Sequence, residues 1–304
     1  MKIKFEIKNR FTGKVMFTLE GDSWKIAFGA AVEAGQSFVE ADLSFKDFSD
    51  MAIDCKRAKF YNATFYNAKF YNAKFYNAKF YNAKFDNATF YNAKFYNATF
   101  YNATFDNAKF YNATFDNATF YNATFYNAKF YNATFDNATF DNATFYNATF
   151  YNATFDNAKF YNATFDNATF DNAKFYNATF DEASWKSIPQ EYLNAVRDDM
   201  FAVLLAYPGE IAALRAALVD GKINGSVYSG VCACLFGTIA KAQHCEVNEL
   251  KGIVRPNSNR PIEVFFYSIQ VGNTPKNSRH AKCAVEWIDQ FIALAKEAGK
   301  VLAK

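Results

Sequence analysis

Phenylalanine recurs every five residues, without a gap, from Phe60 to Phe180. Around each one the motif reads Ala, then Lys or Thr, then Phe, then Tyr or Asp, then Asn. A period of five matches neither the 3.6-residue turn of a helix nor the alternation of a flat strand. A strict repeat instead indicates identical units that stack on one another. This stretch constrains the fold of the chain more than any other.

Each unit predicts a short extended segment followed by a corner. Ala63 and Phe65 are two residues apart, so their side chains point one way while Thr64 and Tyr66 point the other. Asn67 suits the corner because Asn tolerates positive φ and favours turns. A chain that turns at every fifth residue coils, with Ala and Phe inside and the variable residues outside.

This pattern resembles the pentapeptide-repeat family, whose units read small residue, polar residue, Leu or Phe, polar residue and often Gly. The match covers the units from Ala58 to Asn177. The resemblance implies a right-handed, four-sided parallel β-helix in which residues twenty apart stack about 4.8 Å from each other. We expect the Asn corners to form hydrogen-bonded ladders between coils. Phe at every centre and Asn at every corner depart from the family pattern, and this uniformity indicates recent duplication or engineering.

Three regions are predicted. Residues 1–36 read as a β-hairpin with a turn at Thr12-Gly13, followed by a capped helix from Trp24 to Ala34. Residues 37–185 form the β-helix, beginning with degenerate units and slipping in frame by two residues near Cys55, where we expect a bulge or loop. Residues 186–304 are predicted to be mainly α-helical. The hairpin, the helix and the last region would cap the ends of the solenoid.

In the last region, helices are predicted to begin at Pro189, Pro208, Ser226 and Thr274-Pro275. The final helix places five apolar residues on one face: Ala284, Trp287, Ile288, Phe291 and Leu294. The two ends of the chain also look like those of bacterial and phage pentapeptide-repeat proteins of unassigned function. That resemblance rests on residues 7–13, 232–240 and 285–288, and it implies no activity.

Composition sets the wider limits. No run approaches 18 apolar residues, so no membrane span is expected, and the N-terminus lacks the apolar core of a signal peptide. Five Cys without a dense framework suit a reducing cytoplasm, so we expect a cytoplasmic protein. The net charge of +3 indicates no particular partner.

Six Cys and His residues late in the chain invite comparison with a zinc site: Cys232, Cys234, His244, Cys245, His280 and Cys283. The one-residue gap between Cys232 and Cys234 is unusual for zinc, and Cys is among the most buried residue types. A Cys–His nucleophile pair is a further alternative, but no recognisable motif supports it. We therefore expect neither a metal ion, nor a cofactor, nor catalytic residues.

The outward positions of the array carry a second pattern. Ten Lys and nine Asp occupy them, and nine of the ten Lys share a unit with Tyr. At twenty-residue spacing Asp116, Asp136 and Asp156 would stack on one face, where their repulsion would favour a bound cation. The alternative is that water and salt solvate these carboxylates. The same spacing predicts ladders of Tyr.

The favoured function is a non-enzymatic scaffold that binds another protein, as a monomer or as a dimer formed through a cap. One alternative is mimicry of DNA, by which some family members inhibit gyrase-type topoisomerases. Mimicry needs a strongly negative rod, whereas this array carries ten Lys against nine Asp. Another is nucleic-acid binding through the basic third from Lys59 to Lys94, but its six Lys would spread over four faces. Ice binding by Thr ladders is opposed by the bulky Tyr beside them.

Overall fold

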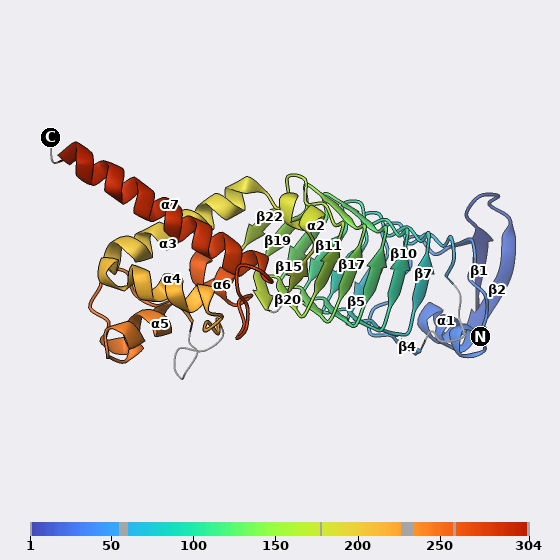
Figure 1. The fold of residues 1–304 in the computed structure, drawn as a ribbon. Helices are drawn as coiled ribbons and strands as arrows, with labels where there is room; N and C mark the ends of the chain where they lie inside the picture. The colour runs from blue at the N-terminus through green and yellow to red at the C-terminus, as the bar shows by residue number, and fades with distance from the viewer. Residues whose placement is uncertain (1, 55–59, 177, 226–233, 258–259, 303–304) are drawn as a thin grey trace. The chain divides into compact units, whose positions relative to one another are not determined.

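The computed structural model describes residues 2–54, 60–176, 178–225, 234–257 and 260–302. The chain divides into two compact units. The first comprises residues 1–173 and 178–189, and the second comprises residues 174–177 and 190–304. We describe each unit by itself, with the chain shown in Figure 1.

The first unit is a parallel β-solenoid of about six coils, with four short sides to each coil. Face 1 comprises β5 (Lys69–Tyr71), β8 (Thr89–Tyr91), β11 (Lys109–Tyr111), β15 (Lys129–Tyr131), β19 (Thr149–Tyr151) and β22 (Thr169–Asp171). Face 2 comprises β4 (Ala52–Asp54), β6 (Lys74–Tyr76), β9 (Lys94–Tyr96), β12 (Thr114–Asp116), β16 (Thr134–Asp136) and β20 (Thr154–Asp156). The predicted four-sided β-helix is confirmed.

Face 3 comprises β7 (Lys79–Tyr81), β10 (Thr99–Tyr101), β13 (Thr119–Tyr121), β17 (Thr139–Asp141), β21 (Lys159–Tyr161) and β24 (Thr179–Phe180). Face 4 has two regular strands, β14 (Thr124–Tyr126) and β18 (Thr144–Tyr146). Elsewhere on face 4 single parallel bridges join the coils, as between Thr64 and Lys84. Face 4 is therefore the least regular side of the solenoid.

The register between coils is twenty residues, as predicted. Phe110 pairs with Phe90 on one side and with Phe130 on the other. At the N-terminal end the offset is 22, because Ile53 pairs with Phe75. The predicted frame slip of two residues is confirmed, while the bulge or loop expected near Cys55 lies outside the described residues.

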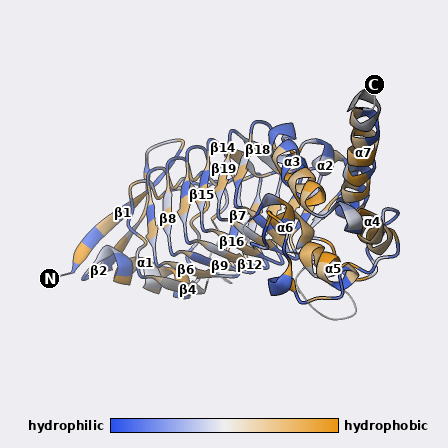
Figure 2. Cartoon of the chain, turned by 90° about the vertical axis from the view of Figure 1, so that its left-hand side faces the viewer, coloured by the Kyte–Doolittle hydropathy of each residue, from blue (hydrophilic) through white to orange (hydrophobic). Residues whose placement is uncertain are grey.

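The interior consists of Phe rings and Ala methyl groups. Phe rings one coil apart stack nearly parallel, as at Phe110–Phe130 with centroids 4.6 Å apart and planes at 5°. Consecutive Phe in one coil meet edge to face, as at Phe110–Phe115 with centroids 5.6 Å apart. Both rings are fully buried, and burial of each contributes about 1.5–3 kcal/mol. The alternation of apolar and polar residues along the coils is visible in Figure 2.

Asn holds the corners in the left-handed region of backbone space. Every corner Asn from Asn62 to Asn172 has φ between 47° and 59°. Most side chains pay a steric penalty there, whereas Asn adopts this conformation readily. The same corner position in the degenerate units holds Glu40, Phe45 and Asp50, also at positive φ.

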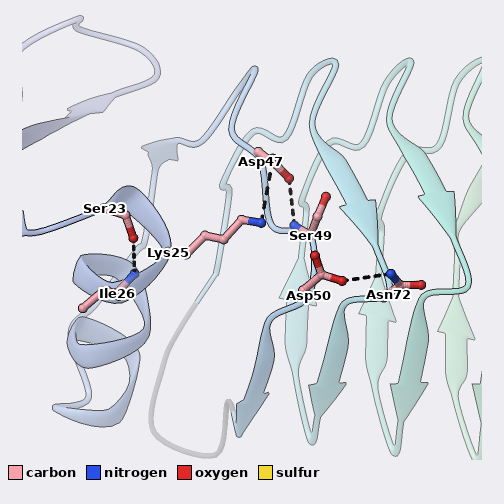
Figure 3. A network of polar contacts seen from close by, with 7 residues as sticks. All are labelled: Ser23, Lys25, Ile26, Asp47, Ser49, Asp50 and Asn72. Atoms are coloured by element: carbon pink, nitrogen blue, oxygen red, sulfur yellow. Dashed lines mark hydrogen bonds and ion pairs between the residues drawn. The ribbon is translucent and has the colours of Figure 1, made fainter.

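The N-terminal hairpin and helix form as predicted. Strands β1 (Ile3–Asn9) and β2 (Val15–Gly21) pair antiparallel, and β3 (Ala41–Asp42) pairs with the other edge of β1. Helix α1 (Trp24–Glu33) begins after Ser23, whose side chain accepts a hydrogen bond from the Ile26 backbone N–H. Lys25 of this helix forms an ion pair of 3.9 Å with Asp47 (Figure 3). These contacts hold the cap against the first coil.

The last coil of the first unit ends in a short helix, α2 (Glu182–Lys186). Asp181 accepts a hydrogen bond from the Asn162 backbone N–H, and Ser184 accepts one from the Ala163 N–H. Trp185 occupies the central position of a pentapeptide by sequence, but it lies in α2 and not in a strand. The helix thus satisfies backbone groups that a further coil would otherwise have bonded.

The second unit is mainly helical. Its elements are β23 (Lys174–Tyr176), α3 (Gln190–Ala206), η1 (Pro208–Glu210), α4 (Ile211–Val219), α5 (Leu235–Ala242), η2 (Val247–Glu249), α6 (Pro261–Phe266) and α7 (Arg279–Leu302). Helix α7 packs on α3 and α4, and α6 packs on α3 and β23. None of the described helices is by itself long and apolar enough to cross a membrane; α3 and η1–α4 pass that test only as a pair bent by 100°.

One predicted helix start in this unit was wrong, and another, Ser226, lies outside the described residues. The helix predicted to continue from Ser226 through Ala242 is interrupted at Cys234, which is extended and caps α5. Helix α7 begins at Arg279, because Thr274 forms a turn in which its N–H donates to Asn277. On α7, Ala284 and Ile288 are buried as predicted, but Leu294 is half exposed.

Candidate functional site

The outward side chains of the array form columns, because the register places equivalent residues in line. On face 1 the residue after each Phe is Tyr in five successive coils: Tyr71, Tyr91, Tyr111, Tyr131 and Tyr151. The predicted Tyr ladder is confirmed, but its rings are not uniformly stacked. Tyr111 and Tyr131 lie parallel with centroids 5.1 Å apart, whereas Tyr91 and Tyr111 are tilted at 6.3 Å.

The Lys residues of the basic third do not gather. Lys69 lies on face 1, Lys74 and Lys94 on face 2, Lys79 on face 3 and Lys84 on face 4. Lys59 lies outside the described residues. These five Lys residues are therefore spread over all four faces, as expected from the sequence.

Two pairs of Lys nevertheless lie directly side by side in adjacent coils. Lys109 pairs in register with Lys129 on face 1, and Lys74 pairs with Lys94 on face 2. Like charges placed opposite each other destabilise a sheet. No ion pair in the described part of the chain involves any of these four ammonium groups.

The acidic column lies on face 2. Asp116 pairs with Asp136, which pairs with Asp156, so the predicted alignment is confirmed. In the described residues, no three Asp, Glu, His or Cys are arranged to hold one metal ion. One oxygen of Asp116 accepts a hydrogen bond of 2.7 Å from the amide of Asn117. Solvation of these carboxylates by water and salt stays the interpretation favoured by the sequence, with cation binding as its alternative.

The predicted Asn ladders are confirmed on three faces. The longest runs through Asn72, Asn92, Asn112, Asn132 and Asn152, with each amide donating to the carbonyl of the preceding Asn at 3.1–3.2 Å. Asp50 extends this ladder downward by accepting from Asn72 (Figure 3). These side-chain bonds tie successive corners together.

The residue before each Asn influences whether the ladder continues. In all nine Asn–Asn bonds of the described chain, the donor follows a Tyr. Asn117 and Asn142 follow Asp, and each donates to that Asp instead. Asn97 follows Tyr without a ladder bond among the described contacts, so Tyr permits the bond but does not guarantee it. The outward Tyr-or-Asp choice therefore affects the frame as well as the surface.

Asp106 on face 4 stands apart from the other carboxylates. Its Oδ1 atom is buried and has no hydrogen-bond partner. Burial, and then the charge of Asp86 one coil below, raise the pKa of Asp106. Asp86 itself accepts a hydrogen bond of 2.9 Å from Thr104. Two acidic residues without a third ligand do not make a metal site.

Sequence reasoning missed an exposed aromatic at the first corner of face 4. Phe45 has φ 59° and is 73% exposed, and its ring meets that of Tyr66 at 5.6 Å. A bulky residue in this backbone region is uncommon. The signal was available, because Phe45 occupies the corner position five residues after Glu40 and five before Asp50.

The predicted Cys and His residues of the second unit are spread over three places. Cys234 caps α5, His244 and Cys245 follow that helix, and His280 and Cys283 lie on α7. Cys232 lies outside the described residues. With that exclusion, the described chain has no group of three metal-ligating side chains. The zinc interpretation thus gains no geometric support from the described residues.

The protonation of these groups also argues against a reactive thiol. Burial raises the pKa of Cys234 to about 11, although its sulfur accepts a hydrogen bond from the Gly237 N–H. Burial also raises the pKa of Cys283 to about 12. A thiol is nucleophilic only as a thiolate, so both would be inert near neutral pH. Burial lowers the pKa of His280 to about 3, which keeps its imidazole neutral beside Phe265.

A buried polar group on α6 was also missed. Glu263 is almost fully buried, and its carboxylate accepts a hydrogen bond of 2.8 Å from the Asn257 backbone N–H. Nearby, Arg260 is paired with Asp199, which also accepts from the Ile262 N–H. From the sequence, residues 262–266 could be a strand or a further helix start, and the structure shows the helix, with Pro261 in its first turn. These contacts fix α6 against α3, so we assign them a structural role.

Comparison with known proteins places the array in a class. The model of pentapeptide repeats matches residues 56–104 and 135–187. Together with the five-residue period and the four-sided solenoid, this identifies the segment as a pentapeptide-repeat array. A search of curated proteins found no match.

Solved structures similar to the chain include several pentapeptide-repeat proteins. One, from the thylakoid lumen of Arabidopsis thaliana, is 29% identical, covers 31% of this chain and has a TM-score of 0.27; the match spans 63% of that protein's length. Rfr23 from the cyanobacterium Cyanothece 51142 is 16% identical over 47% of this chain and 96% of its own, with a TM-score of 0.28. HetL from Nostoc sp. strain PCC 7120, involved in heterocyst differentiation regulation, is 14% identical over 50% and 82%, with a TM-score of 0.19. These scores are low, so the identification rests on the repeat itself.

Proposed function

We propose that the chain is a non-enzymatic scaffold whose solenoid displays ordered columns of side chains to another protein. The observation that carries this proposal is the exact twenty-residue register, which repeats the same outward positions from coil to coil. Regular secondary structure holds such side chains more precisely than loops do. Tyr columns on this frame offer large, rigid contact area at low cost in conformational entropy.

The stiffness of the frame supports the same proposal. Each coil is joined to the next by backbone hydrogen bonds of 2.6–3.1 Å, by stacked Phe rings and by Asn ladders. A preorganised surface loses little entropy on binding. Binding by a rigid face should therefore leave the backbone of the array unchanged.

Photo-crosslinking from each face tests the proposal. A photoreactive amino acid would replace Tyr91 on face 1, Tyr96 on face 2, Tyr101 on face 3 and Tyr126 on face 4, with Leu205 of α3 as the comparison site. The scaffold predicts one abundant, face-dependent protein adduct in the cells that naturally make the chain. Adducts from Leu205 alone would move the function to the helical unit, and none at any position would refute the proposal.

Modularity gives a second test. Deleting one coil, residues 105–124, removes 20 residues and keeps every face in register. The shortened chain should remain folded, with its circular dichroism spectrum and cooperative unfolding retained.

Metal analysis of the purified full chain should find no stoichiometric zinc. One zinc per chain would instead make Cys232 and Cys234 candidate metal ligands again.

Two sequence-based expectations stay predictions. The cytoplasmic location and the choice between monomer and cap-mediated dimer are supported by no comparison.

For DNA mimicry, the longest in-register run of acidic residues in the described chain is the three-residue column on face 2. A continuous negative surface would be needed to imitate a duplex, so we do not adopt that alternative.

A further inference from the structure

We propose that face 1, centred on Lys109 and Lys129, docks an acidic surface segment of a partner protein. This inference rests on the proposed scaffold function and names the face and the chemistry of its partner. It starts from the two in-register Lys pairs, which have the same unit sequence but different neighbours.

The Lys pair on face 1 has neutral neighbours within its own columns. Below it in the column are Thr89 and Tyr91, and above it are Thr149 and Tyr151. The Lys pair on face 2 is different, because Tyr96 pairs with Asp116 of the next coil. The acidic residues in the face 1 columns lie at the two ends: Asp47, beside Lys69, and Asp50, beside Asn72, at one end, and Asp171 at the other. Positive charge on face 1 is therefore concentrated at Lys109 and Lys129.

Around the corner from Lys109 lies Asp106, and no ion pair joins the two in the described part of the chain. The buried Oδ1 atom of Asp106 has no hydrogen-bond partner. Lys109 and Lys129 are both exposed. An acidic partner would relieve the repulsion between these two ammonium groups, which is the charge complementarity that favours one class of partner.

The Tyr column beside the Lys column favours a protein over a nucleic acid. Single-stranded nucleic acids bind by stacking bases on the faces of aromatic rings. Tyr111 and Tyr131, which share units with the two Lys, lie face to face at 5.1 Å and cover one another. Stacked rings offer edges and hydroxyls, which suit a protein surface. Tyr91 and Tyr151, 46% and 40% exposed, extend this contact on either side.

A peptide titration tests the inference with the full chain. The probe is a fluorescein-labelled peptide about 16 residues long, rich in Glu and Leu, which spans about 24 Å as a helix. Fluorescence anisotropy should show saturable binding that weakens as salt rises. The double variant Lys109→Glu/Lys129→Glu should weaken it roughly tenfold. The matched control, Lys74→Glu/Lys94→Glu, makes the same charge change on face 2 and should alter it less than about twofold.

The aromatic contribution has its own pair of variants. Tyr91→Ser on face 1 should weaken binding, whereas Tyr101→Ser on face 3 should not. Thermal melts of every variant would establish that each is folded, and exposed positions are expected to tolerate these changes.

Several outcomes would overturn the inference. Absence of peptide binding, or equal losses in the two Lys variants, would exclude a docking site on face 1. Tighter binding of an oligothymidine of similar length, lost in the same face 1 variant, would make the face a nucleic-acid surface. Photo-crosslinks on other faces, with none from Tyr91, would leave the scaffold function standing and remove only this inference.

Discussion

The two units of this protein are stabilised in different ways. In the array each Phe contacts its equivalents in the coils above and below, as Phe115 does with Phe95 at 5.2 Å and Phe135 at 5.1 Å. In the helical unit each core residue has unique partners, as Phe265 has His280 at 4.8 Å and Trp287 at 5.0 Å. The array is thus a chain of nearest-neighbour contacts, whereas the helical unit has one irregular core.

Removing a ring from the centre of the array should have the largest effect. Phe115→Ala leaves a cavity in a fully buried stack and should cost about 3–5 kcal/mol of the free energy of unfolding. Hydrogen exchange should accelerate in the coils around residue 115 and stay unchanged in α3 and α7. Phe115→Leu, which retains most of the volume, is the control and should cost much less. Equal acceleration in both units would contradict the contrast drawn between them.

The second largest effect is expected from a decrease in pH, which should destabilise the helical unit before it destabilises the array. The neutral His280 of the folded helical unit has a pKa of about 3, against 6.5 for the free side chain. Below pH 6.5 the unfolded chain therefore binds a proton that the folded unit excludes, and stability falls as the pH decreases towards 3. At pH 4.5 the loss should be roughly 2–3 kcal/mol. Denaturant unfolding at several pH values, followed through Trp287, measures it.

The array should respond later and less to acid. The pKa of Asp47 and that of Asp181 lie below the ordinary 3.8, so their contribution is lost only when the pH falls through that range. Asp106 has the opposite sign, because its raised pKa makes the folded array more stable as the pH decreases. His280→Gln should flatten the pH profile of the helical unit. An array that unfolds first between pH 6.5 and 4.5 would contradict this order.

The same contrast explains what could be read from the sequence. The resemblance of the array to the pentapeptide-repeat family implied its four faces and its twenty-residue register. The motif itself predicted the buried Phe and the left-handed Asn corners, because every unit repeats the same evidence. In the helical unit each boundary depends on one local signal. Ser226 and Thr274 resemble helix caps, but Cys234 and the turn at Thr274–Asn277 decide where α5 and α7 begin.

The candidate surfaces were predictable only in part. The Tyr and Asp columns follow from the spacing together with the twenty-residue register that the family resemblance implies. The influence of Tyr or Asp on the next Asn could not be predicted in this way. It depends on whether the Asn amide donates its hydrogen bond to the residue before it or to the Asn in the preceding coil. Likewise, Glu263 looks like an ordinary surface residue in sequence, and only packing on α6 buries it.

Substitutions at the Asn corners measure how much the hydrogen bonds of a ladder contribute to the free energy of unfolding. Asn112 donates to Asn92 and accepts from Asn132, both at 3.1 Å. Asn112→Ala loses both bonds and places Ala at positive φ, which should cost about 1–2 kcal/mol together. Asn117→Ala at the same φ of 52° carries the same backbone penalty but loses only the contact with Asp116. The difference between the two unfolding free energies isolates the ladder, and equal losses would show that the ladder contributes nothing.

The smallest expected effect is a gain. Asp141 interrupts the Tyr column of face 3 between Tyr121 and Tyr161. It also accepts a hydrogen bond of 2.8 Å from the amide of Asn142, so the Asn ladder of this face ends at Asn122. Asp141→Tyr completes the column and frees Asn142 to donate to Asn122, which should stabilise the array by about 0.5 kcal/mol. Asp141→Ala frees the same amide without adding a ring, so comparing the two variants by denaturant unfolding separates the ladder from the Tyr stack. A gain in both would assign the effect to the ladder. A gain in Asp141→Tyr alone would assign it to ring stacking, and a loss in both would mean that the Asp–Asn contact is itself the better corner.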